Sequence, residues 1–374
     1  MHSLFPSDDD WKERVLNLID DKTQPLQETD SPLRCDRWIA SSLLQKSIRR
    51  GETQLALRAA FRLSTFDRSY TWRRLLVIAL EDVGAAEADA VVETVAIATT
   101  PNWRSKHGEK ESLAYAVTRL AEAPKDRSAD YLISAAESHP SLSDVRERCL
   151  KADLQDRLRI VGDLSQALPV RALAAWLSSG IEAYNGPRIG AGDLRELSRT
   201  LVELGASEEL VSSMVLAAKR TREPITVLVP LIWLESHRDQ LAQVCNEAIP
   251  ETPVLDEIPM YAFDKHTRLG LAAIQRLTRE SDELRACLAQ FVPKEAWLNA
   301  VQMAAFYTDA YLISRRLDWS LSRPLEALGI ESDFCRVGVP PEAIEPLRTA
   351  TLDSLDQLNN IRRELWWNEI QARR

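Results

Sequence analysis

Apolar residues recur at helical spacing through most of the chain, and the clearest case is the stretch 73–125. The pattern predicts three helices there: one that ends at Gly84, one over 88–99, and one over 109–123 that ends at Pro124. A glycine just past a helix and a proline after it are ordinary stop signals. No catalytic arrangement of side chains is visible in this stretch, which favours an assembly or packing role.

The same spacing continues on both sides of this stretch, and no strand signal is longer than four or five residues. Four glycines and a proline make 179–193 the most loop-like segment, so we place the main boundary between about 160 and 192. The chain is therefore predicted to be all-α, with a helical N-terminal domain followed by a second helical domain. The predicted ranges are a polar segment at 1–34, the first domain at 35–162 and the second at 192–374. Later helices are predicted over 237–249, 281–291, 294–314 and 343–372.

The net charge of −9 and a pI near 5.3 argue against a protein whose whole surface binds nucleic acid, but they allow a local basic patch. Four arginines lie close together in a stretch almost free of acidic residues: Arg62, Arg68, Arg73 and Arg74. We treat them as a hypothetical DNA- or partner-binding patch, with a solvated helix face as the alternative. Arginine doublets such as Arg49–Arg50 are predicted to lie on solvated helix faces.

Several motifs are absent from the sequence. It contains no GxxxxGK[ST], which argues against a P-loop ATPase, and no HExxH or Cys/His cluster with metal-ligand spacing. No cofactor or metal is predicted. The five cysteines are widely separated and form no CxxC pair, as expected for reduced thiols in the cytosol. No signal peptide and no run of about 18 apolar residues is present, so we expect a cytoplasmic protein without a membrane span.

The strongest candidate for chemistry is the loop Asp264–Arg268, which precedes an amphipathic helix. Its candidate residues are Asp264, His266, Thr267 and Arg268. The first interpretation is structural: Asp264 caps the helix by accepting from the backbone N–H of Thr267. The alternatives are a phosphate or other ligand bound at the helix N-terminus, or catalysis with a second acid that the sequence does not identify.

Two short motifs in the opening stretch resemble a known family. They are RRL at 73–75 with ALEDVG at 79–84, and LAEAPKD at 120–126; KSIR at 46–49 and LALRAA at 55–60 precede them. Residues from about 40 to 140 thereby resemble the C-terminal, non-motor region of the AAA+ replication-associated recombination proteins. That family includes bacterial recombination factor A, also called MgsA, and the eukaryotic Werner-interacting ATPase.

The resemblance implies a helical oligomerisation collar that holds a tetramer, and it supplies no catalytic residues. The AAA+ motor that precedes this region in the family has no counterpart here, and Asp126 stands where the family has serine. The motif residues with an expected structural role are Glu81, Asp82, Gly84, Pro124 and Lys125. Because two acidic side chains at a helix C-terminal end oppose the helix dipole, Glu81 and Asp82 should have basic partners. Candidates for these partners are Arg73, Arg74 and Lys125.

The leading functional hypothesis is a non-catalytic, oligomeric accessory protein of DNA replication, recombination or repair. It would bind DNA or a replication or repair protein through the collar-like domain. One alternative is an enzyme or ligand-binding protein that uses the Asp264–Arg268 loop. Another is a partner, acting in trans, of an ATPase encoded separately on a mobile element.

Overall fold

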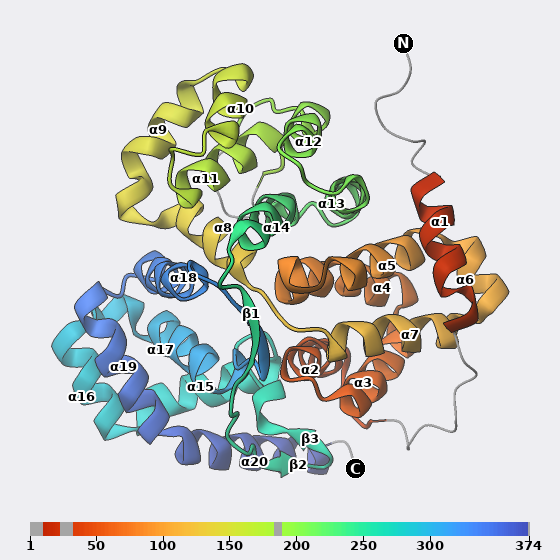
Figure 1. Ribbon diagram of the computed structural model, residues 1–374. Helices are drawn as coiled ribbons and strands as arrows, with labels where there is room; N and C mark the ends of the chain where they lie inside the picture. The colour runs from red at the N-terminus through yellow and green to blue at the C-terminus, as the bar shows by residue number, and fades with distance from the viewer. Residues whose placement is uncertain (1–9, 23–32, 183–188, 373–374) are drawn as a thin grey trace. The chain divides into compact units, whose positions relative to one another are not determined.

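The computed structural model describes residues 10–22, 33–182 and 189–372 (Figure 1). Helices dominate these residues and the strands are short, so the predicted all-α fold is confirmed. Parts of the predicted N-terminal segment and of the glycine-rich loop, at 1–9, 23–32 and 183–188, lie outside the described residues. Within the described part of the chain, no helix is both long and apolar enough to cross a membrane.

Two compact units make up the structure, and each combines segments that are far apart in the sequence. Unit 1 consists of Met1–Thr29, Arg68–Asn246 and Arg315–Ile330. Unit 2 consists of Asp30–Asp67, Glu247–Ser314 and Glu331–Arg374. The domains predicted at 35–162 and 192–374 are continuous in sequence, whereas each compact unit combines three separate segments. As domains, these two ranges stay a prediction.

Unit 1 is built around α5 (Ala88–Thr99), which contacts α1, α4, α7 and α13. Most residues of α5 are apolar, and most are buried, as expected for a helix enclosed by others. The other α-helices wholly within unit 1 are α1 (Asp10–Ile19), α4 (Arg68–Ile78), α6 (Pro101–His107), α7 (Glu109–Glu122), α8 (Ser128–Ser138), α9 (Ser143–Lys151), α10 (Leu154–Gly162), α11 (Leu168–Ser179), α12 (Leu194–Glu203), α13 (Glu208–Thr221) and α14 (Val229–Arg238).

The helix ends in the opening stretch follow the local stop signals. Helix α5 has the predicted bounds, and α7 ends at Glu122, just before Pro124. Helix α4 begins earlier than predicted, at Arg68, and continues into a π-helical turn over Ala79–Val83. Gly84 ends this turn and leads into a 3-10 turn over Gly84–Glu87.

A small antiparallel sheet in unit 1 joins β1 (Gln243–Asn246) to β4 (Arg315–Asp318), with Gln243 opposite Asp318. The backbone of Lys125 lies along the other edge of β4: its N–H donates to the Arg315 carbonyl at 2.9 Å, and its carbonyl accepts from Leu317 at 2.9 Å. Lys125, in the segment that follows α7, is thus held by backbone hydrogen bonds to β4, which lies much later in the sequence.

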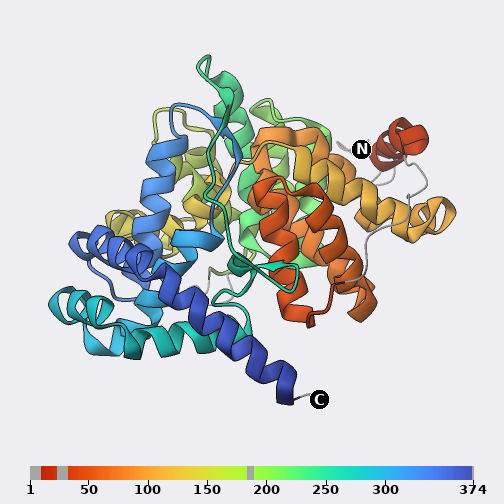
Figure 2. The same ribbon diagram turned by 90° about the horizontal axis from the view of Figure 1, so that it is seen from below.

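Unit 2 begins with the hairpin of α2 (Arg37–Arg50) and α3 (Thr53–Phe66), which lie side by side and antiparallel (Figures 1 and 2). Gly51 reverses the chain with a left-handed φ of 72°. Helix α20 extends to the C-terminal end in Figure 2. The remaining elements of unit 2 are β2 (Val254–Leu255), β3 (Ile258–Pro259), α15 (Arg268–Glu280), α16 (Asp282–Phe291), α17 (Trp297–Ala305), α19 (Pro341–Asp353) and α20 (Leu355–Ala372); α18 (Ser322–Arg336) runs from unit 1 into unit 2.

Three buried arginines in unit 2 converge on a second π-helical turn, Phe306–Ala310. Arg49 donates to the Ala310 carbonyl at 3.2 Å, Arg50 to the Asp309 carbonyl at 2.7 Å, and Arg362 to the Asp309 carboxylate at 2.7 Å. The prediction that Arg49–Arg50 lies on a solvated face is therefore wrong. The helical pattern of the sequence treats Arg49 and Arg50 as polar surface positions. Their guanidinium groups can be buried because carbonyl groups of a distant segment accept their hydrogen bonds.

Several predicted helix boundaries in the second half of the chain are also wrong. The predicted helix 237–249 is replaced by the end of α14 at Arg238 and by β1, because the chain pairs with β4 there. The helix predicted over 343–372 is two helices that meet at Ser354, whose hydroxyl lies 3.2 Å from that of Ser281. The helix predicted over 294–314 is cut short by the π-helical turn, and α18 was not predicted.

Candidate functional site

The two motifs of the opening stretch meet in unit 1. The N–H of Asp126 donates to the carbonyl of Asp82 at 3.0 Å. This hydrogen bond joins the last residue of the second motif to the π-helical turn of the first. Gly84 has φ of 53° and ψ of −131°, a backbone conformation that residues with a Cβ rarely adopt. A Cβ at Gly84 would lie 2.6 Å from the carbonyl oxygen of Asp126. The close approach of the two segments therefore requires glycine at this position.

A buried arginine neutralises the two acidic residues of the first motif. Arg127 binds Glu81 at 3.0 Å and also forms ion pairs with Asp82 and Asp130. The side chains of Arg127 and Asp82 are 2% and 0% exposed, so their charges are balanced away from water. The sequence predicted basic partners but named Arg73, Arg74 and Lys125. The residue that forms these ion pairs is Arg127, which lies directly beyond the end of the motif.

Lys125 binds the end of the helix that precedes it. Its ammonium donates to the carbonyl of Ala121 at 3.1 Å and to that of Ala123, two acceptors at the C-terminal end of α7. Burial lowers the pKa of Lys125 from 10.5 to about 7, while the charge of Asp82 opposes the change and that of Arg315 adds to it. Lys125, one of the predicted basic partners of Asp82, therefore interacts with Asp82 electrostatically.

Replacing Lys125 with methionine should change how stability depends on pH. The unfolded chain keeps the Lys125 proton up to about pH 10.5, whereas the folded chain releases it near pH 7. The free energy of unfolding should therefore rise between these pH values, by roughly 1 kcal/mol per pH unit from this group. In Lys125→Met, urea unfolding at pH 7, 8 and 9 should show a smaller rise than the wild type. An unchanged slope would contradict this assignment.

Asp126 binds the first residue of α8, the helix that follows the second motif. Its carboxylate accepts from the N–H of Ser128 at 3.0 Å and from the Ser128 hydroxyl at 2.6 Å, at the first turn of α8. Burial raises the pKa of Asp126, and these hydrogen bonds from Ser128 oppose the change. Asp126 differs from the serine of the resembling family, yet its short side chain can still accept from the first turn of a helix.

The four arginines of the hypothetical patch fall into different units. Arg62 belongs to unit 2, whereas Arg68, Arg73 and Arg74 belong to unit 1. Arg62 donates twice to the carbonyl of Cys35, at 3.0 and 2.8 Å. Arg68 and Arg73 are exposed, and the guanidinium of Arg73 lies 5.6 Å from the centre of the Tyr70 ring. A common patch of these four residues stays a prediction.

The Asp264–Arg268 loop is anchored within unit 2 by its buried members. Asp264 forms a 2.7 Å ion pair with Lys46 of α2, and its other oxygen accepts from the N–H of His266 at 3.0 Å. Burial alone would raise the pKa of Asp264, but the charges of Lys46 and His266 and the hydrogen bonds from both residues together outweigh it and hold the pKa below its usual range. His266 and Arg268 are exposed, and Arg268 forms an ion pair with Glu369.

The predicted cap of the following helix is wrong. The capping residue of α15 is Thr267, whose hydroxyl accepts from the N–H of Gly270 at 3.1 Å, whereas the N–H of Thr267 donates to the backbone carbonyl of Asp264 at 3.0 Å. The carboxylate of Asp264 turns instead toward Lys46, which lies more than two hundred residues earlier in the chain. Local sequence could not reveal that competing partner.

Thr267→Ala should lower the free energy of unfolding by about 1 kcal/mol, the usual cost of losing a capping hydroxyl. His266→Ala is the matched control because His266 is exposed and adjacent; it should leave stability within about 0.5 kcal/mol. Thermal unfolding of the two variants beside the wild type measures both effects. Equal stability of the two variants would argue against Thr267 as the cap.

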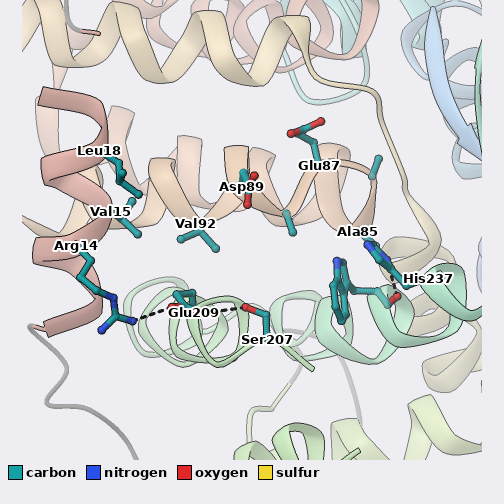
Figure 3. Close-up of a pocket in the computed structure, with 13 residues that line it drawn as sticks. Arg14, Val15, Leu18, Ala85, Glu87, Asp89, Val92, Ser207, Glu209 and His237 are labelled. Carbon is teal, nitrogen blue, oxygen red and sulfur yellow. Dashed lines mark hydrogen bonds and ion pairs between the residues drawn. The ribbon is translucent and has the colours of Figure 1, made fainter. Parts of the chain in front are cut away.

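A cavity of about 570 Å³ lies in unit 1 between α1, the start of α5, α13 and α14 (Figure 3). Val15, Leu18 and Val92 form its apolar end, and Arg14 crosses its edge to bind Glu209 at 2.8 Å (Figure 3). Glu209 also accepts from Ser207 at 3.2 Å. The cavity has the size of a small-molecule site. Two of its charged lining residues, Arg14 and Glu209, bind each other.

The comparisons with known proteins agree with the motif resemblance. A family model described as the C-terminal region of MgsA AAA+ ATPases matches residues 62–147. The match contains both motifs, from Arg73–Gly84 to Leu120–Asp126, and it confirms the resemblance, whereas the segment 46–60 lies outside it. No curated protein and no solved structure shows significant similarity to the chain.

Proposed function

We propose that this chain is a non-catalytic, oligomeric accessory protein of DNA replication, recombination or repair, and that it acts in the cytoplasm. The observation that carries the proposal is the match of residues 62–147 to the C-terminal region of an AAA+ ATPase family. The 374 residues contain no P-loop sequence, so the proposal assigns no ATP hydrolysis to them. A collar-like domain at 35–162 would supply the assembly contacts.

The chemistry of the matched segment supports a scaffold role. Asp82, Lys125 and Arg127 are buried and bind one another's segments or backbone carbonyls, which leaves them without access to a substrate. Buried, mutually satisfied charges hold a unique arrangement of helices. The residues that carry the family resemblance therefore stabilise a framework, and a framework is what an assembly domain needs.

Light scattering coupled to size-exclusion chromatography tests the assembly part of the proposal. A particle mass that is a multiple of 42.2 kDa is expected, with four copies suggested by the resemblance. Gel-shift measurements with forked and single-stranded DNA test the nucleic-acid part. A monomer at all concentrations would overturn the oligomer, and a monomer that also fails to bind any of these DNAs would overturn the whole proposal.

The Asp264–Arg268 loop, the site of the alternative function, is engaged in the fold of unit 2. Its buried members, Asp264 and Thr267, already bind Lys46 and the first turn of α15 within unit 2. A trans-acting role beside a separately encoded ATPase is a variant of the same proposal. Co-purification of an ATPase with the tagged full chain would favour that variant.

A further inference from the structure

Two large aromatic side chains are exposed at one end of the α2–α3 hairpin in unit 2. Trp38 is 53% exposed and Phe66 is 44% exposed. Helix α2 begins at Arg37 and α3 ends at Phe66, so an antiparallel pair brings these two positions to the same end. Arg62 of α3 confirms the proximity because it donates to the carbonyl of Cys35, just before α2, at 3.0 and 2.8 Å.

Each exposed ring lies against an arginine. The guanidinium carbon of Arg37 is 5.2 Å from the centre of the Trp38 ring, and that of Arg62 is 4.4 Å from the centre of the Phe66 ring. The two hydrogen bonds to the Cys35 carbonyl hold the Arg62 guanidinium in place over Phe66. An aromatic ring with a guanidinium beside it is therefore organised before any partner arrives.

The charge around these rings is positive, in contrast to the net charge of −9 for the whole chain. Arg34, three residues before Arg37, is exposed. Among the described residues, the acidic residues close by in the sequence are Asp36 and Asp67. Asp36 accepts from the N–H groups of Trp38 and Ile39, at 2.8 and 2.9 Å, so its carboxylate is engaged in capping α2. Arg34, Arg37 and Arg62 bring three positive charges to this end of the hairpin, which favours an anionic partner.

We propose that this hairpin-end surface, formed by Arg34, Arg37, Trp38, Arg62 and Phe66, binds single-stranded nucleic acid. Bases would stack on Trp38 and Phe66, and phosphates would lie along the arginines. Exposed aromatic rings interleaved with arginines are the elements with which proteins hold unpaired bases without reading their sequence. Duplex DNA does not fit as well, because its bases are already stacked on one another.

The inference rests on the proposed role in DNA metabolism and adds the kind of strand and the place where it binds. The proposed surface also differs from the basic patch predicted from the sequence. Of the four arginines named from the sequence, the surface uses Arg62 alone, together with two arginines and two rings that the sequence did not select.

Fluorescence anisotropy of a labelled oligothymidylate, titrated with the full chain at fixed salt, tests the proposal. Trp38→Ala and Phe66→Ala should each weaken binding about tenfold, the effect of losing one stacked base. Trp38→Phe should recover much of the affinity because it restores a ring. The matched control is Trp367→Ala, a 48% exposed tryptophan on α20 of the same unit, which should bind like the wild type.

A second measurement follows the charges. Arg34→Ala should reduce the slope of log affinity against log salt concentration by about 0.7, the value for one phosphate contact on a single strand. A duplex of the same length should compete poorly. Equal affinity of the wild type, Trp38→Ala and Phe66→Ala would overturn the proposal. So would a fall in particle mass in the two ring variants with affinity unchanged, because the surface would then be a contact between copies of the chain.

The outcomes separate this inference from the proposed function. A wild-type chain that assembles but does not bind the oligothymidylate would overturn the inference and leave the assembly role intact. A chain that binds through Trp38 and Phe66 but stays a monomer would support the inference and overturn the oligomer.

Discussion

Gly84→Ala is expected to destabilise the protein by about 3–5 kcal/mol, because two independent costs add. The first is backbone strain, since Gly84 has φ of 53° and ψ of −131°. The second is steric: the new Cβ would meet the carbonyl oxygen of Asp126 at 2.6 Å. That oxygen belongs to the backbone of a segment tied to β4 through Lys125, so it cannot move aside as a flexible side chain would.

The matched control is Gly190→Ala. Gly190 also has a left-handed φ, of 72°, but none of the described residues lies within 4 Å of a Cβ built there. It should therefore show the backbone cost alone, about 1–2 kcal/mol. Chemical denaturation of the three proteins measures the difference. If the two alanine variants were equally stable, the close approach at Gly84 would carry no energetic weight.

Arg127→Ala is expected to cost about 3–5 kcal/mol, the usual effect of removing one partner from a buried ion pair. The loss would leave the carboxylate of Asp82 without its guanidinium in a position that is 0% exposed. Arg159→Ala is the matched control: Arg159 pairs with Asp156 three residues away, but its side chain is 77% exposed, so no measurable change is expected.

A double-mutant cycle separates the pair from the rest of the arginine's contacts. Asp82→Ala and Arg127→Ala should each destabilise the protein, and the double variant should cost less than the sum of the two. Additive effects would show that Arg127 acts mainly through Glu81 and Asp130, its other two partners.

The same local arrangement occurs once among the described residues of each unit. A π-helical turn ends a helix, its fourth residue is a buried aspartate, and a buried arginine distant in the sequence binds that aspartate. The pairs are Asp82 with Arg127 and Asp309 with Arg362. A π-helical turn marks a departure from regular helix geometry, and such turns are often found at functional sites. Here both turns position an acidic side chain to receive an arginine from another segment.

Local signals predicted the helix ends at Gly84 and Pro124. Gly84 and Pro124 end their segments as expected, because helix termination depends on the backbone conformation of a few neighbouring residues. The motif resemblance was also visible in the sequence, and the family match at 62–147 confirms it. A basic partner for Glu81 and Asp82 was predicted by type, but Arg127 was not among the residues named for that role.

Long-range partners could not be predicted. The capping prediction at Asp264 was wrong because Lys46, on a helix near the start of the chain, competes for its carboxylate. The strand β1 was taken for helix because its partner β4 is about seventy residues away. Arg49 and Arg50 were placed in solvent because nothing in their own helix indicates that backbone carbonyls of a distant turn will bind them.

The sequence by itself determined that this protein is helical, where α5 and α7 end, and that residues near 73–125 resemble a collar region. These properties depend on hydrogen bonds and steric limits within a few residues. Only the tertiary structure decided which charges are buried, which cap α15 has, and that Trp38 and Phe66 stay exposed at one end of a hairpin. Burial and ion pairing depend on which distant segments meet, and the free energy of that choice belongs to the whole fold rather than to any one stretch of it.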